Sequence, residues 1–119
     1  MTTQTIQLRE LAHTRSGDKG NHANVAVIAY SQAGFAWLQE HLTAEVVATY
    51  FAPLGATKVE RFEAANVNAF NFLLHNVLAG GASRSLRIDT QGKALGQAAL
   101  LLPVPKPDDV EKMRRQKPG

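Results

Sequence analysis

Residues 15–30 decide the predicted fold, and they read RSGDKGNHAN followed by VAVIAY. The apolar part, residues 25–30, is rich in Val and Ile and is typical of a central strand covered on both faces. The preceding residues 6–13 place Ile6 and Leu8 on one side of an extended chain and predict another strand. The connection between them is too short for a crossover helix. We therefore expect antiparallel neighbours and disfavour a doubly wound fold.

The rest of the chain alternates expected helices with expected strands. Ser31 and Thr43 are suitable N-caps, because their hydroxyl groups can accept from the free N–H groups of a first helical turn. Helices are expected over 33–42, from 43 to 52, and from 66 to the paired glycines at 80–81, and strands over 57–64, 85–89 and 94–104. This order predicts an α+β, ferredoxin-like sandwich, a mainly antiparallel sheet with helices packed on one face.

The length of 119 residues fits one compact domain, which we place at residues 1–103. Three prolines at 103, 105 and 107 remove backbone donors at alternate positions, so the sheet is expected to end there. Residues 104–119 are predicted to be a polar, basic and flexible tail. This tail carries two of the three net positive charges, so the domain itself is nearly neutral. That distribution argues against nucleic acid as a partner.

Composition also restricts the cellular compartments and the cofactors that we expect for this chain. The chain has no cysteine, which excludes disulfides and thiolate ligands and suits a reducing compartment. Residues 1–10 lack the apolar run of a secretory signal, and no run approaches the roughly 20 apolar residues of a membrane helix. We therefore expect a cytoplasmic protein without a membrane partner. The four histidines have no metal-ligand spacing, and no nucleotide-binding glycine motif occurs, so neither metal nor cofactor is predicted.

The polar stretch 15–24 is the first candidate site. Arg15 can bind a phosphate or carboxylate through two parallel hydrogen bonds, and Lys19 adds a mobile charge. Glycines in this stretch allow backbone N–H groups to converge on an anion. Asp18 can orient Lys19, or act itself as a ligand or base. The alternative is a tight turn whose Asp and Asn side chains bond to their own backbone. The candidate residues are Arg15, Ser16, Asp18, Lys19, Asn21 and Asn24.

The second candidate site lies on the helix expected after Asn66. Asn68, Asn71 and His75 share one face at helical spacing. Asn is a mediocre helix former, so its repeated use here favours chemistry or a specific hydrogen-bond network. His75 is the candidate proton-transfer group of this face. A solvated surface face with a structural histidine is the alternative.

The third candidate site is the strand expected over residues 85–89 with its flanks. Arg84 and Arg87 point to opposite sides of an extended chain, so only one of them can face a shared site. Either can contact a carboxylate or phosphate of a substrate. The alternative is an ordinary structural pair between Arg87 and Asp89.

Three separated motifs carry a family resemblance: RSGDKGN with Asn24, NVNAFNF at 66–72, and SRSLRID at 83–89 with GK at 92–93. Over residues 6–103 they resemble the C-terminal domain of the AtuA-like family, the acyclic terpene utilisation proteins. In that family the small domain is ferredoxin-like, in agreement with the element order above. Typical members carry a much larger domain ahead of it. The resemblance therefore implies a stand-alone version that partners a separately encoded AtuA-like large subunit.

The resemblance also implies a role in bacterial catabolism of acyclic terpenes and related branched acids, handled as acyl-CoA thioesters. The three polar groups would then complete a site at the subunit boundary. Arg15 and Lys19 would bind the anionic part of a small substrate, with Asp18 or His75 as the proton-transfer group. The resemblance assigns no chemical step. Two alternatives stay open: a self-sufficient homo-oligomeric ligand-binding protein or enzyme, and a structural or regulatory interaction module.

Overall fold

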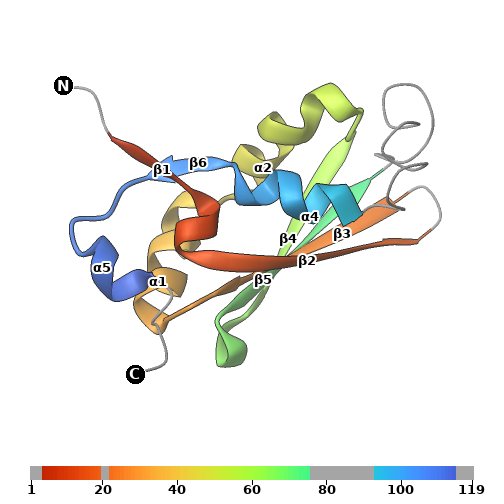
Figure 1. Cartoon of the computed structure of the whole chain (residues 1–119). Helices are drawn as coiled ribbons and strands as arrows, with labels where there is room; N and C mark the ends of the chain where they lie inside the picture. Colours follow the sequence, from red (N-terminus) through yellow and green to blue (C-terminus); the bar gives the residue numbers. More distant parts are fainter. Residues whose placement is uncertain (1–3, 20–21, 76–92, 115–119) are drawn as a thin grey trace.

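The computed structural model describes residues 4–19, 22–75 and 93–114 (Figure 1). Its strands are β1 (Thr5–Gln7), β2 (Ala12–Lys19), β3 (His22–Ala29), β4 (Lys58–Ala64), β5 (Ala69–His75) and β6 (Pro103–Pro105). Its helices are α1 (Gln32–His41), α2 (Ala44–Phe51), α4 (Lys93–Leu100) and α5 (Val110–Met113), with single 3-10 turns η1 (Leu8–Glu10), η2 (Ala52–Leu54) and η3 (Ala65–Val67).

Two antiparallel sheets organise these elements. The larger sheet has the order β2-β3-β5-β4, so β3 and β5 are central and β2 and β4 form its edges. Every neighbouring pair in it is antiparallel. A short ribbon pairs β1 with β6, two segments from opposite ends of the chain.

The core lies on one face of the larger sheet. Val25 and Val27 of β3 and Phe70 and Phe72 of β5 are each 1% exposed or less. Side chains of α1, α2 and α4 pack onto them, as in the stacked rings of Phe35 and Phe70, whose centroids are 4.6 Å apart. We call this the covered face. The predicted α+β, ferredoxin-like class with helices on one face is confirmed (Figure 1).

The opposite face of the sheet, here the open face, is covered by no described element (Figure 1). Along β3 the burial alternates strictly, with residues of one parity buried and those of the other half-buried. The prediction of a central strand is confirmed, because β3 has a neighbour on each side. The prediction that it is covered on both faces is not met by the described elements, which cover one face.

Both predicted helix caps are confirmed. The backbone N–H of Gly34 donates to the Ser31 hydroxyl over 2.9 Å at the start of α1. The backbone N–H of Val46 donates to the Thr43 hydroxyl over 3.1 Å at the start of α2. Each bond satisfies a donor that has no partner within its own helix.

The helix predicted from residue 66 is wrong for its described part, which is strand β5 preceded by η3. Asn68 ends η3 in the left-handed region at φ 56°, which Asn tolerates better than most residues. From there Phe70, Phe72 and Leu74 alternate into the core. Pairing with β3 on one side and β4 on the other outweighs the helical spacing of the same apolar residues. Residues 76–81 of that predicted helix lie outside the described residues.

The strand predicted over residues 94–104 is also wrong in its first part, which belongs to α4. This helix packs against β2 through a glycine. The Thr14 hydroxyl donates to the Gly96 carbonyl over 2.8 Å, and the Gly96 N–H donates to the Ser16 hydroxyl over 3.2 Å. The strand predicted over 6–13 is interrupted by η1, which buries Leu8 and Leu11 completely. The strand predicted at 85–89 lies outside the described residues.

Residues 104–114 pack on the domain, so the predicted flexible tail does not describe them. β6 extends the pairing with β1 to Pro105, and Val104, Val110 and Met113 are buried. The Trp37 indole N–H donates to the Pro105 carbonyl over 2.8 Å. The Arg114 guanidinium also lies 2.7 Å from a carboxylate oxygen of Glu10. Thus α5 and β6 belong to the same packed unit as α1 and β1.

In the described part of the chain, no helix combines the length and the apolar character needed to cross a membrane.

Replacement of Gly96 by alanine is expected to destabilise the fold by about 1 kcal/mol. An added Cβ would lie 2.9 Å from the Ser16 Oγ and 3.3 Å from the Thr14 Oγ1, so both anchoring bonds must shift. Overpacking of this kind costs about 1–3 kcal/mol, against about 1 kcal/mol gained in helix propensity. Thermal melting measures the effect. Gln97→Ala, at the exposed next position, is the control and should be nearly neutral; an unchanged melting temperature for Gly96→Ala would contradict the tight packing.

Candidate functional site

The described residues of the polar stretch, 15–19 and 22–24, belong to two paired strands rather than to a loop. The residues from Ala12 to Lys19 pair one-to-one with those from Ala29 back to His22. Gly17 pairs with Asn24, and its backbone φ angle is not in the positive region. The predicted nest of converging N–H groups is therefore wrong for this part of the stretch. The chemistry of the stretch depends on which side chains face which side of the sheet.

Cross-strand register brings polar residues of different strands together on the open face. Residues directly opposite each other in an antiparallel ladder share a face. One row across the sheet runs Arg15, Ala26, Asn71 and Phe62. The next row runs Gly17, Asn24, Leu73 and Glu60. His75, opposite Lys58, lies one further step along β5.

Asn24 and Asn71 form the centre of this surface. The Asn24 side-chain N–H donates to the Asn71 side-chain carbonyl over 3.3 Å. Gly17 leaves room for the amide, since a Cβ at that position would meet the Asn24 Oδ1 at 3.2 Å. Arg15 is exposed and forms no hydrogen bond or ion pair with another residue of the described ranges. A guanidinium beside an amide pair provides several donors for an anionic or carbonyl oxygen.

His75 pairs with a carboxylate on the neighbouring strand. Its Nε2 lies 3.0 Å from the Glu60 Oε2, and the Lys58 Nζ lies 3.5 Å from the other oxygen of Glu60. The His22 ring packs edge-on against the His75 ring, with 5.0 Å between centroids. The hydrogen bond from His75, and after it the positive charge of Lys58, lowers the pKa of Glu60 below its usual value. Glu60 is therefore ionised at neutral pH.

The AtuA ferredoxin-like domain family matches residues 6–105, which is most of the chain. The chain belongs to this family. No curated protein and no solved structure matches it. The AtuA-like resemblance seen in the motifs is thereby confirmed, including its ferredoxin-like fold.

Four predicted site residues of this AtuA ferredoxin-like domain lie together on the open face. They are Arg15, Asn24, Asn71 and His75, from β2, β3 and β5. The prediction that Asn71 and His75 share a face is right, but they share it as odd-numbered residues of a strand rather than on a helix. This placement joins the first and second candidate sites into one surface.

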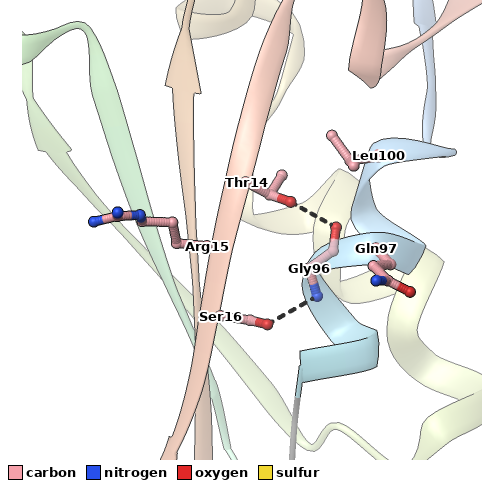
Figure 2. Close-up of a pocket in the computed structure, with 6 residues that line it drawn as sticks. All are labelled: Thr14, Arg15, Ser16, Gly96, Gln97 and Leu100. Carbon is pink, nitrogen blue, oxygen red and sulfur yellow. Dashed lines mark hydrogen bonds between the residues drawn. The ribbon is translucent and has the colours of Figure 1, made fainter. Parts of the chain in front are cut away.

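Other predicted residues lie elsewhere. Ser16 is on the covered side, bonded to Gly96 as described, and helps to line an open pocket of about 450 Å³ between β2 and α4. Arg15 also borders this pocket, but Figure 2 shows its side chain extending from the other side of β2, away from Gly96. Asn68 sits at the end of β5, where its carbonyl accepts from the Ala29 N–H. Ser16 and Asn68 thus each make a contact within the fold away from the open-face cluster, and their predicted role in substrate binding stays a prediction.

The remaining predicted residues are only partly described. Asp18 and Lys19 pair with Ala23 and His22 in the β2–β3 ladder. Asn21, Arg84 and Arg87 lie outside the described residues. The third candidate site accordingly stays a prediction.

Sequence reasoning missed Glu60, His22 and Phe62. A signal for Glu60 and Phe62 exists in the sequence of β4, where Lys58, Glu60 and Phe62 are alternate residues and therefore lie on the same face of the strand. The imperfect apolar alternation of this strand arises because Phe62 faces outward and is 52% exposed. Over residues 4–19, 22–75 and 93–114 no three His, Asp or Glu side chains approach closely enough to hold a metal ion.

The pKa of Glu60 should rise toward its usual value in His75→Phe, because the hydrogen bond from His75 is the largest cause of its lowering. Lys58→Met should also raise this pKa, because the charge of Lys58 and its hydrogen bond both lower it. A carboxyl ¹³C NMR titration measures both. The lowered pKa means that the contact stabilises the fold above the usual pKa of Glu and that this contribution is lost as pH falls through the folded value. An unchanged pKa of Glu60 in His75→Phe would contradict the assignment.

Proposed function

We propose that this AtuA ferredoxin-like domain is the small subunit of an AtuA-like catabolic enzyme acting on branched or terpenoid acids as acyl-CoA thioesters. The open face of the sheet is its contribution to the active site. One observation carries the proposal: Arg15, Asn24, Asn71 and His75, distant in sequence, come together on a face that no described element covers.

The distribution of polarity on the open face suits such a substrate. Arg15 supplies a cation for a carboxylate or phosphate group. Phe62 lies in the same row of the sheet, and Ala26 between them adds a small apolar surface. Ile28 of β3 extends this apolar area one step further along the strand. An anionic ligand with a branched hydrocarbon part finds both kinds of contact within neighbouring rows.

The shape of the surface supports a second subunit. Small-molecule sites usually bury 70–90% or more of a drug-sized ligand. The described part of the open face contacts a ligand from one side only, so a further surface is needed to close over it. A separately encoded AtuA-like large subunit is the partner we propose for that role. Phe62, at 52% exposure, is an apolar residue available to contact it.

The first test is co-expression of this chain with an AtuA-like large subunit, followed by co-purification and light scattering. We expect a defined hetero-oligomer that binds a branched acyl-CoA. Failure of the two chains to associate would contradict the proposed partnership. Binding of the thioester by the chain alone, as a homo-oligomer, would favour the self-sufficient alternative.

The second test locates the ligand by calorimetry. Arg15→Ala is expected to weaken acyl-CoA binding about 10- to 100-fold, because it removes a hydrogen-bonding charge. Arg9→Ala is the matched control, an exposed arginine in η1 away from the open face, and should bind normally. A lower melting temperature with normal binding in Arg15→Ala and Asn71→Ala would instead favour a structural module.

A further inference from the structure

The open face holds a histidine–carboxylate pair. His75 on β5 and Glu60 on β4 are joined by a 3.0 Å contact between Nε2 and Oε2. The two side chains are 25% and 36% exposed, so solvent and small molecules can reach them in the described structure. The edge-on ring of His22 restricts the positions open to the His75 ring.

The contact determines which nitrogen of His75 carries the hydrogen. An ionised carboxylate can only accept a hydrogen bond, so Nε2 must be the donor. In the neutral imidazole the other nitrogen, Nδ1, then holds the free electron pair. Glu60 is ionised at neutral pH, since a glutamate is ordinarily ionised there and the His75 bond and Lys58 lower its pKa further. The pair thus presents a ring of fixed tautomer with one basic nitrogen.

We infer that His75 is the base of the open-face site and that Glu60 is its positioning residue, acting on the proton next to a thioester carbonyl. This inference rests on the proposed function for its substrate class. A carboxylate that holds a histidine in one tautomer and balances the imidazolium is a recurring arrangement for proton transfer. The carbon next to the carbonyl carries the readily removed proton of a saturated branched acyl thioester.

The step balances without any oxidant or reductant. Nδ1 takes the proton, and the electron pair of the broken C–H bond forms a carbon–carbon double bond. The carbonyl pair moves to oxygen and gives an enolate. The resulting imidazolium faces ionised Glu60 across the 3.0 Å contact, which balances its charge. Return of the proton from Nδ1 restores the thioester.

The chain contains its own control pair. His41 and Glu40 also bring a histidine next to a glutamate, but their nearest nitrogen and oxygen are 3.8 Å apart. That separation is too long for a hydrogen bond. The pair lies at the end of α1, where the His41 ring packs against Trp37. Glu40→Gln therefore matches Glu60→Gln in chemistry and differs from it in location.

The tautomer is tested by ¹H–¹⁵N NMR of the imidazole nitrogens at alkaline pH, with the chain alone. His75 is expected as the Nε2–H tautomer in the parent. Glu60→Gln should give a mixture, because an amide can donate as well as accept. Glu40→Gln should leave the His75 signals unchanged. A mixed or Nδ1–H tautomer in the parent, or insensitivity to Glu60→Gln, would overturn the inference.

The proton transfer is tested with 3-methylbutanoyl-CoA in D₂O, using the chain assembled with its large subunit and mass spectrometry to detect deuterium. His75→Gln and Glu60→Gln should each lower kcat for exchange at least about tenfold with little change in KM. Glu40→Gln should exchange at the parent rate. If the assembly binds the thioester but does not exchange deuterium, or if Glu60→Gln exchanges at the full rate, the inference on His75 and Glu60 is overturned while the proposed function is not. If the two chains neither assemble nor bind the thioester, the proposed function is overturned. The NMR measurement of the His75 tautomer in the chain alone then tests the positioning of His75 by Glu60.

Discussion

A chain that ends at Pro103 should lose on the order of 5 kcal/mol of folding free energy. Val104, Val110 and Met113 are between 1% and 6% exposed, and burial of each such side chain contributes about 1.5–3 kcal/mol. The bond from Trp37 to Pro105 is lost as well. Because domains of this size are stable by only about 5–15 kcal/mol, the shortened chain is expected to be largely unfolded.

Circular dichroism during thermal melting measures this loss. A chain that ends at Arg114 is the control, since it keeps every contact named for β6 and α5. If the shortened chain does not accumulate, Val110→Ala and Met113→Ala in the full chain give smaller losses at the same interface. A chain ending at Pro103 that melts within a few degrees of the parent would show that residues 104–114 contribute little to the fold.

Phe70→Ala should cost about 3–5 kcal/mol, as expected for removal of a fully buried ring. Phe70 is 0% exposed and lies in the middle of the covered face. Its ring stacks on Phe35, and the Arg61 guanidinium lies 5.3 Å from its centroid. Urea unfolding measures the change. Phe70→Leu, which keeps most of the apolar volume, is the milder variant for the case in which alanine prevents folding.

Phe62→Ala is the matched control for Phe70→Ala. Phe62 lies on the neighbouring strand but faces outward and is 52% exposed, so its removal should change stability by about 0.5 kcal/mol or less. The contrast between these two phenylalanines also checks the strand parity of the sheet. Equal losses for both would contradict the assignment of covered and open faces.

The start of the fold was predictable because its signals are local. The caps at Ser31 and Thr43 depend on a hydroxyl three residues before a backbone donor. The antiparallel pairing of β2 and β3 follows from the short connection between them. These features need no knowledge of distant residues, so the sequence indicates them directly.

The segment after Asn66 was mispredicted because two periodicities coincide in it. Phe70 and Leu74 fit a helical stripe at i and i+4, and they also fit a strand together with Phe72 at i+2. Local spacing does not distinguish these alternatives. The choice is made by β3 and β4, which pair with the segment on both sides. A tertiary preference of this kind is absent from any single window of sequence.

The C-terminal part was mispredicted for a related reason. Prolines at 103 and 105 indicate the end of a sheet, yet an edge ribbon tolerates residues that lack an N–H. β6 is such a ribbon, and it pairs only with β1. Its partner is about a hundred residues away in sequence, so nothing near the prolines signals the pairing.

The candidate site was predicted in its residue types and missed in its assembly. Arg15 and Asn24 were identified because they belong to a dense polar stretch, and Asn71 and His75 because they are polar residues in a mainly apolar segment. Glu60 was missed because its meeting with His75 depends on the β4–β5 register. Because a helix is expected after residue 66, the sequence does not indicate any strand register for His75.

From Phe70 to His75, buried residues alternate along β5 with exposed or half-buried ones, so the core and the open face are coupled residue by residue. Insertion or deletion of one residue near Ala69 would reverse the parity of everything after it. Asn71 and His75 would then turn toward the apolar interior while Phe72 and Leu74 turned toward solvent. This strand can accept substitutions one position at a time, but it cannot accept a change in length without losing packing and polar surface together.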